Sequence, residues 1–174
     1  MKRILFSLYL SLIAILTFAT DGFTVADVFT DHMVLQRNAI IKIWGEAQNG
    51  SLVEVRFAGQ LQKVKAIQGK WQVTLKTGEA GGPYKLEVIN GNNKVSFQDV
   101  LIGDVWLAGG QSNMEFALRR VKDAQTEISL ADYPQIRYYK VPRKFYPEQE
   151  VSKASWRVCS PQTAPEFSAI AYYF

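Results

Sequence analysis

Short apolar runs alternate with turn residues along the first half of the chain. Between residues 23 and 99 these runs are separated by turns rich in Gly and Asn, at intervals of about 8 to 12 residues. The alternation is clearest in VEVRF at residues 53–57, a period of two that is typical of strands with one buried face. The pattern predicts an all-β, sandwich-like domain over residues 20–99. Its expected strands are 33–36, 39–44, 52–57, 61–67, 71–76, 84–89 and 94–97.

The pattern changes at residue 99. The nearly continuous apolar run 100–108 is typical of a parallel strand that is covered on both faces. Apolar residues then recur every three or four positions from 117 to 128, which predicts one amphipathic helix. Pro134 is expected to stop this helix, and 135–141 predicts a second strand. Strand, helix and strand in this order predict the first unit of a parallel α/β sheet, so we assign residues 100–174 to an α/β domain.

A further helix is predicted at the end of the chain, where Phe167, Ile170, Ala171 and Phe174 have helical spacing. A helix stop signal does not follow them, and one strand-helix-strand unit is too small to close a parallel sheet. The expected fold class is therefore a β-sandwich followed by a truncated α/β domain, in the N-terminal part of a longer protein.

The first residues have the features of a signal peptide. Basic residues at 2 and 3 precede an apolar segment that ends near Ala19, so residues 1–19 are expected to be removed during export. The mature protein is then expected in the periplasm or outside the cell, or as a lysosomal or secreted protein in a eukaryotic host, with no stable membrane span. An uncleaved membrane anchor is the alternative interpretation.

Charge and cysteine content exclude several classes of protein. The net charge of +4 falls to +2 once Lys2 and Arg3 are removed, and the remaining basic residues form no stripe, which argues against nucleic acid as a partner. Cys159 is the single cysteine, so an intrachain disulfide is impossible and a buried apolar role is expected. No residues have metal-ligand spacing, and no cofactor is expected.

Ser112 is the candidate nucleophile, because it lies at the turn between the apolar run 100–108 and the predicted helix. A serine hydroxyl needs a neighbouring imidazole to take its proton during attack. The single histidine, His32, lies in the predicted β domain, where a structural or surface role is expected. The chain alone therefore does not complete a Ser-His-Asp site.

The GQSNME sequence at residues 110–115 resembles the nucleophile block of the sialate O-acetylesterase family, a branch of the SGNH-type hydrolases. Supporting matches are DHMVLQR at 31–37, GDVWL at 103–107 and FSAIAYYF at 167–174. The resemblance implies an exported serine carbohydrate esterase with a β-sandwich beside a flavodoxin-like catalytic domain. Its implied substrates are O-acetylated sialic acid or other acetylated glycans.

Only Ser112 is carried over as catalytic, as the nucleophile and as a backbone N–H donor to the oxyanion. The family's His, its preceding Asp and its other oxyanion donors belong to blocks that have no match here. Gly110 is expected to permit the tight turn, and Gln111 to brace that turn or face the pocket. Asn113 and Glu115 fall in the first helical turn, with capping or substrate contact as their alternatives.

Two other functions stay open. The β-sandwich of a non-catalytic protein could bind carbohydrate, or the chain could be an inert truncated remnant. As it stands, the chain is expected to be inactive as an esterase, and its sequence does not identify which acetylated sugar the intact protein attacks.

Overall fold

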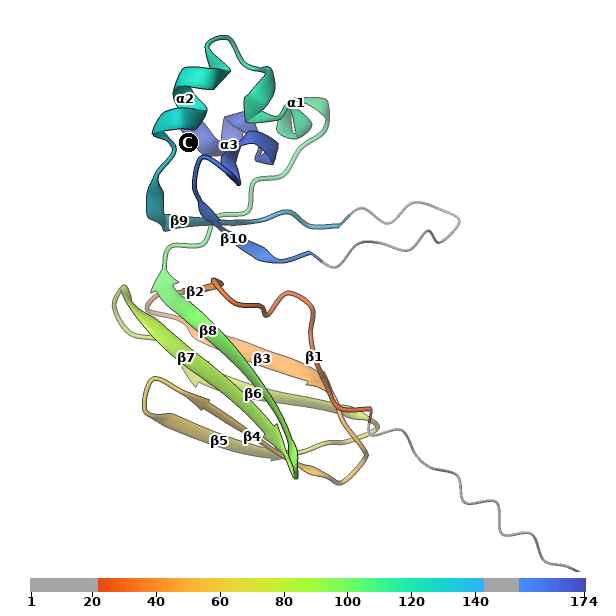
Figure 1. Ribbon diagram of the computed structural model, residues 1–174. Coiled ribbons are helices and arrows are strands. Elements are labelled where there is room, and N and C mark those ends of the chain that lie inside the picture. Colours follow the sequence, from red (N-terminus) through yellow and green to blue (C-terminus); the bar gives the residue numbers. More distant parts are fainter. Residues whose placement is uncertain (1–21, 143–153) are drawn as a thin grey trace, which may run out of the picture.

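The computed structural model describes residues 22–142 and 154–174 (Figure 1). The predicted signal peptide lies outside these residues. Strands make up most of the regular secondary structure, and the helices are few and short. The strands are β1 (Thr24–Val25), β2 (Val34–Gln36), β3 (Ile40–Glu46), β4 (Leu52–Phe57), β5 (Gln60–Lys65), β6 (Lys70–Lys76), β7 (Gly81–Asn90), β8 (Asn93–Gly103), β9 (Tyr133–Tyr139) and β10 (Trp156–Cys159). The strands predicted between residues 33 and 97 are confirmed as β2 to β8.

Two sheets enclose one apolar core. One sheet has the order β1-β3-β6 and the other β2-β8-β7-β4-β5, and Figure 1 shows them as two layers. Ile43 and Leu75 from the first sheet and Val55 and Leu86 from the second are fully buried in the same cluster. Each such side chain stabilises the fold by about 1.5 to 3 kcal/mol relative to an exposed position. The period of two in the sequence therefore marks the inner faces of both sheets.

The prediction of one strand over 100–108 is wrong. Strand β8 continues across Asp99 and ends at Gly103, with parallel pairing to β2 and antiparallel pairing to β7. Val100 and Ile102 point into the core of the two sheets, so the first part of the apolar run completes the β structure instead of opening a new sheet. Residues 104–111 form no regular secondary structure. Strand β8 therefore runs across residue 99, where the sequence analysis places the division between the two domains. The division into two domains itself stays a prediction.

The single helix predicted from 117 to 128 is replaced by three short pieces, α1 (Ser112–Glu115), the 3-10 turn η1 (Leu118–Arg120) and α2 (Ala124–Leu130). The first break arises because Leu118 N–H donates to the carbonyl of Phe167, and Phe116 C=O accepts from the N–H of Ala169. The second break coincides with Asp123, whose left-handed φ of 61° is incompatible with helix. Contacts with a distant segment thus override the local helical period.

The expected parallel sheet is also not found in the described residues. Strand β9 pairs with β10 in an antiparallel two-stranded sheet, and Pro134 lies within β9 instead of ending a helix. This position is tolerated because, in the part of the chain that the structure describes, β9 has β10 as its one strand partner and is an edge strand. The order of elements suggested a parallel unit, but strand pairing depends on contacts that the order does not encode.

The last part of the chain forms the 3-10 turn η2 (Ala164–Glu166) and the helix α3 (Ala169–Tyr173), which confirms the predicted helix. Its buried residue is Ala169, whereas the predicted apolar positions Ile170 and Phe174 are exposed. Ala169 and Leu118 belong to a second, small core with Cys159, which is 1% exposed as predicted. None of the helices in the described residues is long and apolar enough to cross a membrane.

Candidate functional site

Ser112 is the first residue of α1 and is exposed to solvent. The carbonyl of Gln111, at the helix N-cap, accepts hydrogen bonds from the N–H groups of Met114 (2.9 Å) and Glu115 (3.2 Å). Neither the hydroxyl nor the N–H of Ser112 makes a hydrogen bond to another described residue, as expected for an N–H in the first turn of a helix. Both groups are therefore accessible to a substrate.

The neighbours of Ser112 have mainly local roles in the geometry. A Cβ on Gly110 would lie 3.2 Å from Cβ of Met114, so a larger residue here would press against α1. The side chain of Gln111 does not cap the helix; its backbone carbonyl supports the turn. Asn113 C=O accepts from Phe116 N–H at 3.2 Å, and the side chains of Asn113 and Glu115 are exposed in this single turn. Whether Gln111, Asn113 or Glu115 contacts substrate stays a prediction.

The α1 segment is held by the start of α3, a contact that the sequence analysis did not identify. Ala117 and Ser168 form an antiparallel bridge. The Ser168 hydroxyl also donates to the sulfur of Met114 at 3.2 Å, and Ala169 N–H donates to Phe116 C=O at 2.8 Å. The GQSNME and FSAIAYYF sequences therefore lie in contact, and their shared resemblance to one family was the available signal.

His32 is engaged elsewhere and is not brought to Ser112. Its Nδ1 lies 2.7 Å from Oδ2 of Asp99, and Arg137 Nη1 donates to the same oxygen at 2.6 Å. The hydrogen bond from Arg137 lowers the pKa of the Asp99 carboxyl against the opposing effect of burial, and His32 lowers it further. His32 and Asp99 both have positive φ, 66° and 52°, so this cluster fixes backbone that is costly for these residues. Its role is structural, as expected, and the described chain contains no imidazole beside Ser112.

Relatives of the chain are carbohydrate esterases, although no family model matches it. Human sialate O-acetylesterase is 35% identical over 133 residues, which cover 69% of this chain and 25% of the relative. The Rattus norvegicus sialate O-acetylesterase is 36% identical over 135 residues, covering 69% and 24%. A carbohydrate acetylesterase from Xanthomonas citri superposes with a TM-score of 0.80 at 36% identity, covering 86% of this chain and 35% of that one.

The chain belongs to the sialate O-acetylesterase family. The family resemblance inferred from the sequence is thereby confirmed, whereas the role of Ser112 stays a prediction. The chain spans about a quarter of the length of the curated relatives it matches.

The β9–β10 hairpin joins the serine-bearing segment of this family member to its two-sheet core. Trp156 in β10 donates from Nε1 to the carbonyl of Val28 (2.9 Å) and from its backbone N–H to the hydroxyl of Thr30 (3.0 Å). Its indole packs against the main core and, at 5.7 Å between ring centroids, against Tyr139. Together with the ion pair between Arg137 and Asp99, these contacts attach the hairpin to the β sheets.

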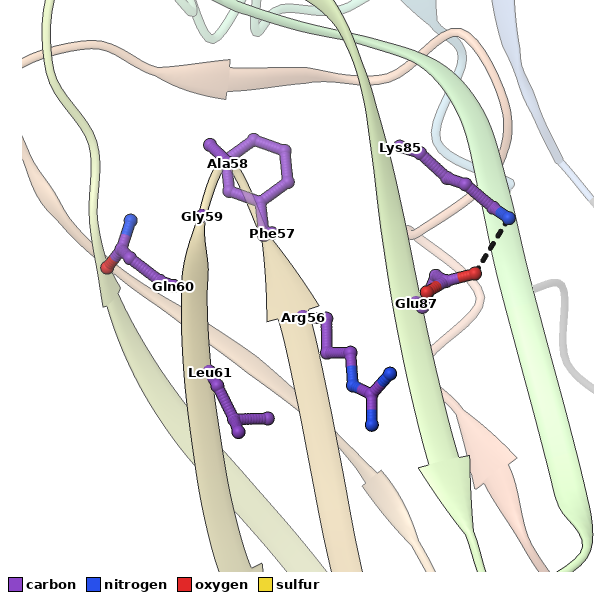
Figure 2. A pocket seen from close by; sticks show the side chains of 8 residues that line it. All are labelled: Arg56, Phe57, Ala58, Gly59, Gln60, Leu61, Lys85 and Glu87. Carbon is purple, nitrogen blue, oxygen red and sulfur yellow. Dashed lines mark ion pairs between the residues drawn. The ribbon is translucent and has the colours of Figure 1, made fainter.

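A pocket of about 330 Å³ lies on the β sheets, not at Ser112 (Figure 2). Within it, Lys85 Nζ pairs with Glu87 at 2.7 Å. Hydrogen bonds from Lys85, and next from Lys94, lower the pKa of Glu87 to about 2. The open, charged lining has no nucleophile with a base, so the pocket is no alternative esterase site. Its lining residues are Arg56, Phe57, Ala58, Gly59, Gln60, Leu61, Lys85 and Glu87.

The described residues contain no group of three or more His, Cys, Asp or Glu side chains placed to hold a metal ion.

Proposed function

We propose that this chain carries the nucleophile of a serine carbohydrate esterase that removes O-acetyl groups from sialic acid or another acetylated sugar. The observation that supports this most directly is Ser112 itself. It is exposed at the start of α1, with hydroxyl and N–H both unbonded to described residues, in a chain of the sialate O-acetylesterase family. An acetylated carbohydrate is the proposed substrate class because the relatives are a sialate O-acetylesterase and a carbohydrate acetylesterase.

In the proposed reaction, Ser112 Oγ attacks the acetyl carbonyl while an imidazole takes the hydroxyl proton. The Ser112 N–H donates to the oxyanion of the tetrahedral intermediate. Collapse breaks the bond to the sugar oxygen, which receives the proton and leaves, and water then hydrolyses the acetyl-serine. His32 is not assigned as this base, because its half-exposed ring is paired with Asp99 and Arg137 and makes no hydrogen bond to Ser112. The base has to come from outside the described residues, so we expect no turnover by this chain alone.

The finer architecture belongs to the same proposal. The two sheets correspond to a β-sandwich, and the segment after β8 to the first part of a flavodoxin-like, SGNH-type domain. The TM-score of 0.80 with an intact carbohydrate acetylesterase supports this assignment. We also propose export from the cell, supported by the basic and apolar residues at the start of the sequence.

A chimera tests the proposed activity. The chain replaces the matched quarter of human sialate O-acetylesterase, and release of acetate from O-acetylated sialic acid is measured. We expect activity that is lost on Ser112→Ala. Ser129→Ala is the matched control, because Ser129 is an exposed serine on the neighbouring helix α2. Full activity in the Ser112→Ala chimera would refute the assignment of the nucleophile.

A further inference from the structure

Strand pairing brings basic side chains that are scattered along the sequence onto one face of the five-stranded sheet. The register of β4, β5, β7 and residues 93–97 of β8 alternates inward residues with outward ones, and seven of the outward residues are charged. Five are basic and two are acidic, which gives this face a net charge of +3, against +4 for the whole sequence. We call this set of residues the basic face: Glu54, Arg56, Lys63, Lys65, Lys85, Glu87 and Lys94.

Glu54 orders two of the cations of the basic face without neutralising both. Its carboxylate accepts hydrogen bonds from Lys63 Nζ at 2.6 Å and from Arg56 Nη2 at 3.3 Å. The hydrogen bond from Lys63 lowers the pKa of Glu54, and that from Arg56 lowers it further, so the group is ionised at neutral pH. Among the described residues Arg56 makes no other hydrogen bond, which leaves Nε and Nη1 of its planar guanidinium available. A guanidinium of this kind is suited to bind a carboxylate.

The pocket on the β sheets opens within the basic face (Figure 2). Arg56 and Lys85 both line it, and Leu61, 49% exposed, adds an apolar wall. Glu87 pairs with Lys85 and with Lys94, each at 2.7 Å, so this acid also orders two cations. The volume of about 330 Å³ lies at the lower end of the range for small-molecule sites, about 300 to 1,000 Å³. Cations beside an apolar wall match a single sugar ring that carries a carboxylate.

The pocket also lies toward the end of the sheet from which the chain continues to Ser112. Tyr84, which precedes the pocket residue Lys85, pairs with Val100, and β8 ends at Gly103. At about 3.3 Å per residue, the separation along β8 from Val100 to Gly103 is about 10 Å. The pocket is thus in the half of the sheet that leads into the serine-bearing segment (Figure 1).

We infer that the basic face binds the carboxylate groups of an acidic glycan, with Arg56 and Lys85 as the contacts at the pocket. Charge complementarity supports this occupant, because a carboxylated sugar supplies the negative charge that two acids among five cations do not. Sialate, the substrate named for the human and rat relatives, is such a sugar acid. The pocket and its apolar wall favour a sugar ring over a phosphate backbone, for which exposed positive charge is sufficient. The inference rests on the proposed function for the choice of glycan, and the site binds without taking part in the chemistry.

An NMR titration of the chain with tetrasialic acid at low salt tests the site. We expect binding that weakens at least about tenfold in Arg56→Gln, because charge-assisted hydrogen bonds are lost. Arg119→Gln is the matched control with unchanged affinity, since Arg119 is also exposed and also pairs with one carboxylate, Glu166, but lies outside the basic face. Lys65→Gln is expected to weaken binding about two- to fivefold. It removes an exposed charge that pairs with no acid among the described residues, so it tests the site even if Arg56→Gln disturbs the sheet.

Several results would overturn the inference. These are the absence of binding at millimolar tetrasialic acid, the same affinity in the chain and in both basic-face variants, and equal binding of cellotetraose, which has no carboxylate. Tighter binding of a DNA duplex or of phosphatidylserine vesicles, lost in Arg56→Gln, would overturn it as well, because the partner would then be a nucleic acid or a membrane. In the chimera, binding that depends on Arg56 without acetate release would uphold the site and reject the esterase proposal. Acetate release without such binding would do the reverse.

Discussion

Replacing Arg137 by Met should destabilise the protein by about 2 to 3 kcal/mol, as expected for removing one partner of a charge-assisted hydrogen bond. The Arg137 side chain is only 6% exposed. It donates to the Asp99 carboxylate through Nη1 at 2.6 Å and Nη2 at 3.4 Å, and to Pro134 C=O through Nε at 2.8 Å. Met preserves much of the apolar stem of Arg, so the decrease in the free energy of unfolding reports the loss of the charge and its hydrogen bonds. Asp99 keeps partial access to water, which places the cost below that of a fully buried pair.

Urea unfolding at pH 7 measures this cost, with Arg119→Met as the matched control. Arg119 pairs with Glu166 at a similar distance, 2.7 Å, but both side chains are exposed, so the control should cost less than about 1 kcal/mol. Equal costs for the two variants would refute the argument that burial of Arg137 makes its ion pair the stronger one.

The same cluster predicts a dependence on pH. The pKa of Asp99 is lowered in the folded protein, so its contribution is fully present above the ordinary carboxyl value of 3.8 and is lost as the pH falls through the lowered pKa. Arg137→Met, which removes the main cause of the lowered pKa, should therefore destabilise the protein less at pH 2 than at pH 7. An unchanged cost at both pH values would contradict this linkage.

Two further predictions concern the β sheets. Gly45→Ala should destabilise the protein by about 1 to 3 kcal/mol or more in urea unfolding, because the new Cβ would collide with the backbone of β1. Gly78→Ala, where a Cβ meets nothing within 4 Å, should be nearly neutral, and a neutral Gly45→Ala would contradict the close approach. In an NMR titration Glu87 should titrate near pH 2, because Lys85 and then Lys94 donate hydrogen bonds to its carboxylate. Lys94→Met should raise that pKa, and an ordinary pKa in the unsubstituted protein would contradict the pairing.

Local pattern was sufficient for the strands of the β sheets and insufficient for the segment around Ser112. The alternation in β4 can be recognised within a few residues, because the side chains that point into the core are apolar and those between them are not. The helix predicted after Ser112 failed because hydrogen bonds to Phe167 and Ala169, some fifty residues away, replaced helical ones at Phe116 and Leu118. The partner of Asp99 was equally hidden, since Arg137 lies 38 residues further along the chain and no local pattern links the two.

The described residues position Ser112 but do not provide the base that would activate it. The position of Ser112 is defined within the described residues, because β8 brings the chain to the loop before it and the start of α3 holds the segment after it. Activation needs a base, and the single histidine is fixed on the β sheets by Asp99. A serine hydroxyl without a neighbouring base is a weak nucleophile, however well it is placed. In the proposed reaction, the imidazole that activates Ser112 therefore has to come from polypeptide outside the described residues, because the one histidine of the sequence is paired with Asp99.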